Sequence, residues 1–268
     1  MCTTCGCSSE EAVVTEPGQP ARVVTEDHGH DHDHHHGHDL GGHHHHEADP
    51  ATRTLVLEQA VLARNDMLAE ANRAWFGGRQ ILAVNLMSSP GAGKTTLLER
   101  TITDLSGELD LSVVEGDQET LLDAERIRAT GCKVVQINTG AGCHLDAAMV
   151  ARGLQVLEPH AHSIVLIENV GNLVCPALFD LGERAKIVIM SVTEGQDKPL
   201  KYPQMFRAAE LMILNKIDLV PYVTFDPEQC ITYARQVNPK LDVISLSATR
   251  GDGLDRWYDW LREEMNRR

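Results

Sequence analysis

The chain has 268 residues and a formal net charge of −15 at pH 7, a length that allows a buried core in one large domain or two smaller ones. No basic stripe indicates nucleic acid as a partner, and no apolar run approaches the roughly 20 residues that span a bilayer. The first residues also lack a signal peptide's basic start and apolar centre. We therefore expect a cytoplasmic protein, whose seven cysteines are thiols, metal ligands or buried residues rather than disulfides.

Residues 1–50 differ from the rest, because they hold ten acidic residues and one basic residue. Large apolar side chains are nearly missing over residues 8–50, which predicts a disordered tail. Ahead of them, Cys2, Cys5 and Cys7 are spaced closely enough to fold round one ion. Three thiolates and a fourth donor, such as the terminal amine, suit square-planar Ni²⁺ or tetrahedral Zn²⁺, whereas an iron–sulfur cluster needs a fourth cysteine within reach.

Residues 28–46 hold eleven of the fourteen histidines of the chain. Imidazole favours nickel, copper and zinc, so this run predicts many weak, interchangeable sites suited to nickel storage. The interleaved Asp and Gly residues argue against an expression tag. The predicted storage ligands are His28, His30, His32, His34, His35, His36, His38, His43, His44, His45 and His46.

A helical pattern begins near Thr54 and runs to Phe76, where Gly77 and Gly78 end it. Its apolar residues recur at three- and four-residue steps, which predicts an amphipathic helix. They are Val56, Ala60, Ala63, Met67 and Ala71. The sequence does not decide whether this helix covers a sheet or meets a partner. We divide the chain into a metal-binding tail (1–50), this helix (51–78) and a nucleotide-binding domain (79–268).

After residue 80, short apolar runs alternate with helical stretches such as Lys94–Leu105 and Glu119–Ala129. This alternation predicts an α/β fold with a mostly parallel sheet covered by helices on both faces. The predicted strands are Ile81–Met87, Leu111–Glu115, Lys133–Ile137, Ser163–Ile167, Lys186–Ser191, Leu211–Leu214 and Leu241–Ser245.

The first of these strands runs into a Walker A sequence, residues 88–96, and then into a helix. Glycines in such a loop let backbone N–H groups surround phosphate at a helix N-terminus. Lys94 is expected to reach the outer phosphates and the Thr95 hydroxyl to ligate Mg²⁺, while Ser88 replaces the first glycine of the consensus. The predicted nucleotide-binding residues here are Gly91, Ala92, Gly93, Lys94, Thr95 and Thr96.

The sequence Asn215-Lys216-Ile217-Asp218 follows a predicted strand and resembles the guanine-recognition motif of GTPases. A carboxylate such as Asp218 can accept hydrogen bonds from the N1–H and the exocyclic amine of guanine, and adenine lacks this donor pair. Ser247 and Ala248 resemble the second guanine loop, whose backbone N–H meets the carbonyl oxygen of the base. The predicted nucleotide is therefore GTP.

Two acidic residues follow predicted strands, where they can meet the metal and the γ-phosphate. Asp117 is expected to ligate Mg²⁺, and Glu168 to hold it through water or to orient the attacking water. Gly171 would then sense the γ-phosphate through its N–H. The alternative, in which either acid only caps a strand end, stays open. No arginine finger can be chosen, so intrinsic hydrolysis is expected to be slow.

A second group of metal ligands lies within the predicted nucleotide-binding domain. Cys143 and His144 stand at the start of a helical stretch, where the helix N-terminus favours a thiolate. Cys175 is four residues beyond Gly171, so the γ-phosphate could move it directly. Three ligands leave a tetrahedral ion one short, and a water or a second subunit would complete it. The other thiols and histidines are interpreted as buried cysteines and loop residues: Cys132, Cys230, His160 and His162.

Taken together, these motifs resemble the hydrogenase nickel-incorporation GTPases, the HypB family of metallochaperones. The stretches that carry the resemblance are residues 2–7, 88–96, 115–118, 142–145, 168–176, 193–203 and 215–218. The resemblance implies a GTP-dependent homodimer that works with a partner nickel-insertion protein and delivers Ni²⁺ to the large subunit of [NiFe]-hydrogenase. It also implies a Ni²⁺ or Zn²⁺ site formed by Cys143, His144 and Cys175 at or near the dimer interface, and a tighter nickel site in the N-terminal thiols. Lys198 would approach the nucleotide or the partner subunit.

The favoured hypothesis is a GTP-hydrolysing switch whose nucleotide state controls nickel affinity and transfer. Two alternatives remain. One is a urease-maturation or zinc-delivery GTPase, against which the N-terminal thiols and the Cys143-His144 pair argue. The other is a nickel-storage protein with a regulatory GTPase domain, against which the intact Lys94, Thr95 and Asp218 argue.

Overall fold

The computed structural model describes residues 13–15, 22–23, 50–117, 122–140 and 142–267. The three N-terminal thiols and the histidine run therefore lie outside the described residues. Among the helices that are described, none is both long and apolar enough to cross a membrane.

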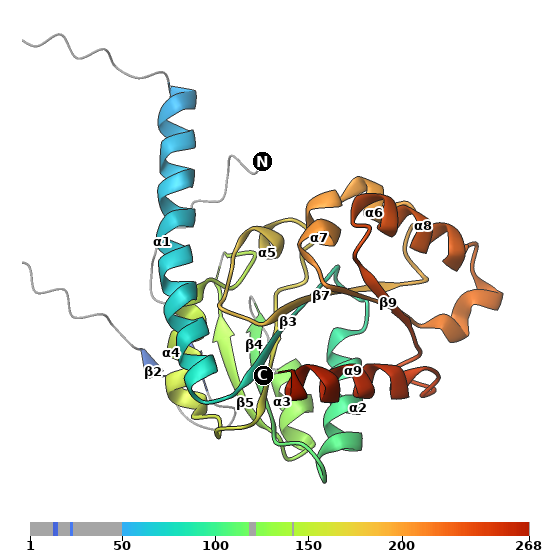
Figure 1. The fold of residues 1–268 in the computed structure, drawn as a ribbon, viewed down its shortest axis with the longest axis horizontal. Helices are drawn as coiled ribbons and strands as arrows, with labels where there is room; N and C mark the ends of the chain where they lie inside the picture. Colours follow the sequence, from blue (N-terminus) through green and yellow to red (C-terminus); the bar gives the residue numbers. More distant parts are fainter. Residues whose placement is uncertain (1–12, 16–21, 24–49, 118–121, 141, 268) are drawn as a thin grey trace, which may run out of the picture.

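A single sheet forms the centre of the molecule, with the strand order β2-β1-β5-β4-β6-β3-β7-β8-β9 (Figure 1). Strands β3 to β9 pair with one another only in parallel, as predicted. They are β3 (Leu82–Ser88), β4 (Leu111–Asp117), β5 (Lys133–Asn138), β6 (Ile164–Glu168), β7 (Ala185–Ser191), β8 (Leu211–Asn215) and β9 (Asp242–Ser245). Each begins within one residue of its predicted start, and none ends more than two residues from its predicted end.

The helices follow the strands in the predicted alternation, and α2 has the predicted bounds. They are α1 (Pro50–Gly78), α2 (Lys94–Leu105), α3 (Leu122–Ala129), α4 (Ala147–Leu157), α5 (Cys175–Leu178), α6 (Lys198–Lys201), α7 (Pro203–Ala208), the 3-10 helix η1 (Ile217–Tyr222), α8 (Pro227–Val237) and α9 (Leu254–Asn266). The sequence had not predicted the short helices α5 and α6, which are only one turn long.

Two strands of the tail differ from the predicted disorder. β1 (Val13–Thr15) pairs antiparallel with the edge strand β5 and with β2 (Arg22–Val23). The three residues of β1 are all β-branched, which favours an extended backbone. The free edge of β5 offers unpaired N–H and C=O groups that can bind such a segment. The rest of the predicted disordered tail lies outside the part of the chain that the structure describes.

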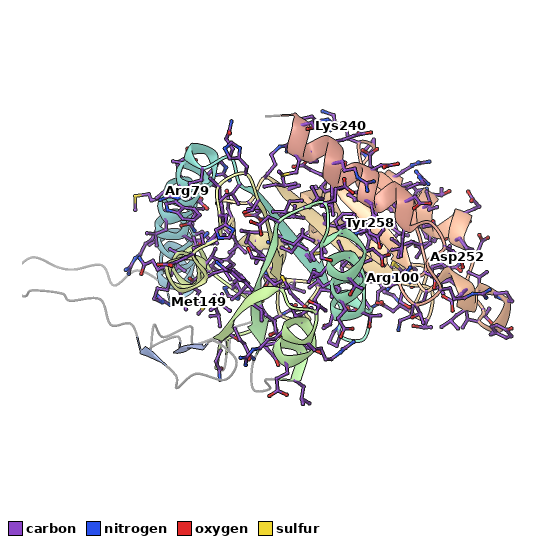
Figure 2. All side chains as sticks on the ribbon, turned by 90° about the horizontal axis from the view of Figure 1, so that it is seen from below. Arg79, Arg100, Met149, Lys240, Asp252 and Tyr258 are labelled. Carbon is purple, nitrogen blue, oxygen red and sulfur yellow. The ribbon has the colours of Figure 1, made fainter. Side chains whose placement is uncertain are left out.

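Helices cover both faces of the sheet, because alternate residues of each central strand enter different apolar clusters. In β3, Leu82 and Val84 pack with residues of α2, α3 and α9, whereas Ala83 packs with residues of α1 and α4. Figure 2 shows this separation, with Met149 of α4 on the opposite side of the sheet from Tyr258 of α9. The continuous burial of these strands follows from this double covering.

Helix α1 covers the sheet, although not through the predicted face. Met67 is 70% exposed, and Ala63 and Ala71 are also exposed. The buried face runs instead through Asn65, Ala69, Asn72 and Phe76, which recur at helical spacing. Asn65 and Asn72 were overlooked because they are polar. Their carboxamides form hydrogen bonds with the backbone of Ala147 and of residues 180–181, and these bonds offset the cost of burying them. The first turns of α1 extend away from the sheet (Figure 1).

Candidate nucleotide and metal site

The Walker A residues connect β3 to α2 and form one wall of a pocket of about 500 Å³. This pocket lies at the carboxyl ends of the parallel strands, the usual ligand position in such sheets. It is lined by Pro90, Gly91, Ala92, Gly93, Lys94, Thr95, Thr96, Asp117, Asp123, Arg126, Glu168, Val170, Gly171 and Lys216. The structure thus brings together most of the predicted phosphate-binding residues and both predicted acids.

The loop conformation depends on glycine at Gly93, whose φ is +94°. A Cβ at this position would also lie 2.6 Å from Nδ2 of Asn215. The buried Lys94 ammonium donates to Ser88 Oγ over 3.0 Å and lies 4.0 Å from Glu168 Oε1. Ser88, which replaces the consensus glycine, therefore holds the lysine that was predicted to bind phosphate.

A pair of buried carboxyl groups lies at the pocket, and one of them, that of Glu168, is part of its wall. Glu168 ends β6, and its register partner Glu115 lies on β4. Thr95 Oγ1 donates to Glu168 Oε1 over 2.8 Å. Burial raises the pKa of Glu168 against the opposing charge of Lys94. Burial and the neighbouring Glu168 raise the pKa of Glu115 to about 9.

One oxygen of Glu115 and one of Glu168 have no hydrogen-bond partner among the described residues. Unpaired buried carboxylate oxygens are costly unless a cation or donor meets them. Together with the Thr95 hydroxyl and Asp117 on the pocket wall, this donor set fits Mg²⁺, which prefers oxygen ligands. Sequence reasoning did not assign a role to Glu115, although its place at the end of an apolar strand beside Asp117 was a usable signal.

Arg126 of α3 also lines the pocket and was not selected from the sequence. Its guanidinium donates to Glu99 over 2.6 Å and to Asp123 over 3.0 Å. Desolvation by burial lowers the pKa of Arg126, but the hydrogen bonds to Glu99 and Asp123 together outweigh it, so the pKa is raised. In this conformation the guanidinium therefore lies at the pocket while paired with two carboxylates.

Asn215 joins the phosphate loop to the two predicted guanine loops. Its Nδ2 donates to the Ala92 carbonyl over 3.0 Å, while its Oδ1 accepts from the N–H groups of Lys216 and Ala248. Lys216 Nζ donates to the Gly91 carbonyl over 2.7 Å. Of the second predicted guanine loop, the Ala248 N–H is thus bound to Asn215. Asp218 lies in η1; neither it nor Ser247 lines the pocket.

The second predicted constellation is assembled as a compact group. The ligand atoms of Cys143, His144 and Cys175 all lie within 4.8 Å of one another. The two thiol sulfurs are 2.9 Å apart, and Cys143 Sγ is 3.7 Å from His144 Nδ1. The predicted helix start at Cys143 is wrong, because α4 begins at Ala147 with Asp146 as its N-cap. Cys175 is the first residue of α5.

His144 is held as a metal ligand would need to be. Its imidazole is buried and stacks on Phe179 with ring centroids 3.9 Å apart. Burial lowers the pKa of His144 against the opposing charge of Asp146, so the ring is neutral at pH 7 and can donate a lone pair. Two sulfurs and one imidazole suit Ni²⁺ or Zn²⁺ and leave one position of a four-coordinate ion open.

The remaining predicted residues lie apart from these groups. Lys198 pairs with Glu194, which also accepts a hydrogen bond from Ser89 of the phosphate loop, and Lys198 does not line the pocket. Cys230 is fully buried and Cys132 partly buried, and burial raises the pKa of each thiol to about 12. The expected loop residues are His160 and His162, and both are exposed in the turn before β6.

Comparison with known proteins agrees with this geometry. Residues 82–245 match the family model "CobW/HypB/UreG, nucleotide-binding domain". The chain is 56% identical over 212 residues to the hydrogenase maturation factor HypB of Escherichia coli K12. The aligned region covers 79% of this chain and 73% of that relative. This chain belongs to the HypB family.

Solved structures of the HypB family confirm the predicted fold. HypB from Archaeoglobus fulgidus matches with a TM-score of 0.71 at 41% identity, covering 76% of this chain and 100% of that one. HypB from Helicobacter pylori, crystallised in complex with nickel, matches with a TM-score of 0.72 at 36% identity, covering 76% of this chain and 96% of that one.

Proposed function

We propose that this protein is a GTP-hydrolysing nickel metallochaperone that delivers Ni²⁺ to the large subunit of [NiFe]-hydrogenase under nucleotide control. The observation that carries this proposal is the cluster of Cys143, His144 and Cys175, whose Cys175 is four residues beyond Gly171 of the nucleotide pocket. The names of the relatives as hydrogenase maturation factors and the nickel complex of the Helicobacter pylori relative support it.

The pocket residues account for binding and hydrolysis of GTP. Lys94 would turn from Ser88 to the outer phosphates, and Asp218 would select guanine. Thr95 and Asp117 would hold Mg²⁺, which neutralises charge on the phosphate oxygens when bound. Glu168 would orient the attacking water. With Arg126 occupied by two carboxylates, the rate of hydrolysis in the single subunit is expected to be slow.

The metal cluster accounts for the cargo. Cys143, His144 and Cys175 would hold Ni²⁺, or Zn²⁺ in competition with it, through two thiolates and a neutral imidazole. A water or a ligand from a second subunit of a GTP-dependent homodimer would fill the fourth position. Cys2, Cys5 and Cys7 would form the tighter site, and the histidine run would store nickel. A partner nickel-insertion protein would assist the transfer in the cytoplasm.

Nickel affinity in three nucleotide states tests this proposal: nucleotide-free, GDP-bound and bound to a non-hydrolysable GTP analogue. The full chain should carry Cys2→Ser, Cys5→Ser and Cys7→Ser, so that thiolate-to-nickel charge-transfer absorption reports only the internal cluster. We expect nickel affinity at this cluster to change with nucleotide, and Cys143→Ala to remove the absorption. Cys132→Ala, which changes a thiol away from the cluster, is the matched control. Equal affinity in every state would contradict nucleotide control of delivery.

A further inference from the structure

Leu145, the residue after His144, contacts the two chain segments that carry the acidic residues of the nucleotide pocket. Its side chain is fully buried against Gly116, which precedes Asp117. The contact is so close that a Cβ on Gly116 would lie 2.6 Å from Leu145 Cγ. The Leu145 backbone N–H donates to Oδ1 of Asn169 over 3.1 Å. The loop of the metal ligands therefore rests on both segments that carry the acids of the pocket.

Asn169 is the residue that makes the second of these contacts, and it is 1% exposed. Its Oδ1 also accepts from the Val170 N–H over 3.0 Å, and its Nδ2 donates to Oδ1 of Asn85 over 3.3 Å. Its own N–H donates to the carbonyl of Leu86 over 3.1 Å. One carboxamide thus connects the metal loop, the segment that leads to Gly171, and the strand that leads into the phosphate loop.

A weaker second bridge joins the same two loops. Asn172 Nδ2 donates to the Cys143 carbonyl over 3.4 Å, and its Oδ1 accepts from the Val174 N–H over 2.8 Å. Gly171 itself packs against Pro90 of the phosphate loop, where an added Cβ would lie 3.1 Å from the proline ring. The segment from Glu168 to Cys175 therefore contacts the phosphate loop on one side and the metal loop on the other.

We infer that Asn169 and Leu145 couple the nucleotide pocket to the metal cluster, with Asn169 as the positioning residue. This inference rests on the proposed function. A movement of Gly171 toward a γ-phosphate would carry the Asn169 carboxamide with it, and Leu145 must follow because its N–H is held there. His144 and Cys143 would then shift relative to Cys175. Such a link is a packed, hydrogen-bonded element that both ligands can bias, which is what coupling between sites requires.

The test is the ratio of two nickel affinities, one measured in the GDP state and one with a non-hydrolysable GTP analogue. Both are measured at the internal cluster, in the full chain that carries Cys2→Ser, Cys5→Ser and Cys7→Ser. Coupling free energies between sites usually give ratios of about 5 to 150. We expect Asn169→Ala to bring this ratio within about threefold of one, because the Leu145 N–H loses its partner. By linkage, the nucleotide affinity should also lose its dependence on nickel.

The control is Asn238→Ala, which removes a partly buried carboxamide that donates to two backbone carbonyls, those of Phe206 and Ala209. It should retain the ratio of the parent chain. Gly116→Ala, which pushes on Leu145 from the other side, should change the ratio, and Leu145→Ala added to it should relieve the overlap. These two variants also keep the test open if Asn169→Ala does not fold.

A measurement without metal separates coupling from stability alone. Amide hydrogen exchange at Leu145 should differ between the GDP and GTP-analogue states in the parent chain, and this difference should vanish in Asn169→Ala. If Asn169→Ala keeps the affinity ratio, or lowers nickel affinity equally in every state, the coupling role of Asn169 is wrong while the proposed function stands. If the parent chain itself has a ratio of one, nucleotide control fails, and this inference fails with it.

Discussion

The nucleotide pocket and the metal cluster are neighbours, yet they are built in different ways. The pocket uses residues at or after the ends of four parallel strands, β3, β4, β6 and β8, and its loops are tied together by contacts such as those of Asn215 with Ala92 and Ala248. The metal cluster uses two loops and a one-turn helix, which are held in place by side chains from elsewhere. The pocket is therefore anchored directly to the sheet, whereas the position of the cluster depends on contacts from neighbouring segments and can change with them.

The largest effect is expected from a substitution that disables the nucleotide pocket and leaves the metal cluster intact. Lys94→Ala removes the only ammonium that lies within 4.0 Å of Glu168 among the described residues. Loss of one group that stabilises transition-state charge costs about 10²- to 10³-fold in rate, so we expect at least that loss in single-turnover GTP hydrolysis. Nickel binding to the nucleotide-free chain should stay within about threefold, since Lys94 is not a ligand of the cluster. A parallel loss of nickel binding would show that the two sites do not differ in this way.

A smaller effect should come from the support of the metal loop. Asn72 donates to the carbonyls of Ala147 and Leu181 over 2.8 and 3.0 Å, and Asn65 accepts from the Ala147 N–H. Asn72→Ala leaves two buried carbonyls without this donor and should lower the free energy of unfolding by about 1–3 kcal/mol. Chemical denaturation measures this change.

The matched control for Asn72→Ala is Met67→Ala, on the exposed face of the same helix. It should change the free energy of unfolding by less than about 0.5 kcal/mol. If Met67→Ala lowered the free energy of unfolding more than Asn72→Ala does, the apolar face that the sequence predicted for α1 would be the packed one after all. If Asn72→Ala lowers nickel affinity and leaves nucleotide affinity unchanged, the metal cluster depends on this support and the nucleotide pocket does not.

The sequence predicted the pocket better than its surroundings, for a physical reason. Residues 88–96 form one continuous motif and Asn215–Asp218 another. Each motif follows directly on a buried strand, so the apolar pattern of that strand is enough to place it. The cluster was predicted as a set of ligands, but its local structure was not, because Cys143 lies before the true helix start and Cys175 begins a helix of one turn.

The failures concern residues whose role depends on distant contacts. The buried face of α1 was missed because Asn65 and Asn72 are polar, and only the backbone groups that they bind, more than 70 residues away, make their burial favourable. Glu115 and Asn169 were overlooked for the same reason: a strand-end carboxylate or amide acquires its role from what the neighbouring strands place beside it. Apolar periodicity contains no information of this kind.

The smallest expected effect concerns the protonation of the cluster. Burial lowers the pKa of His144 from 6.5 in the folded, metal-free chain, although Asp146 opposes the shift. Between the lowered value and 6.5 the unfolded chain binds more protons at this residue, so its contribution to stability is present above pH 6.5 and is lost as the pH falls through the folded-state pKa. The midpoint of thermal unfolding should therefore fall slightly more on acidification in the parent chain than in His144→Gln, which cannot titrate. His162→Gln, at an exposed histidine, is the control and should behave as the parent does. Equal slopes in His144→Gln and the parent chain would mean that His144 is protonated without cost, and the neutral imidazole that we assign to the cluster would then not be enforced by the fold.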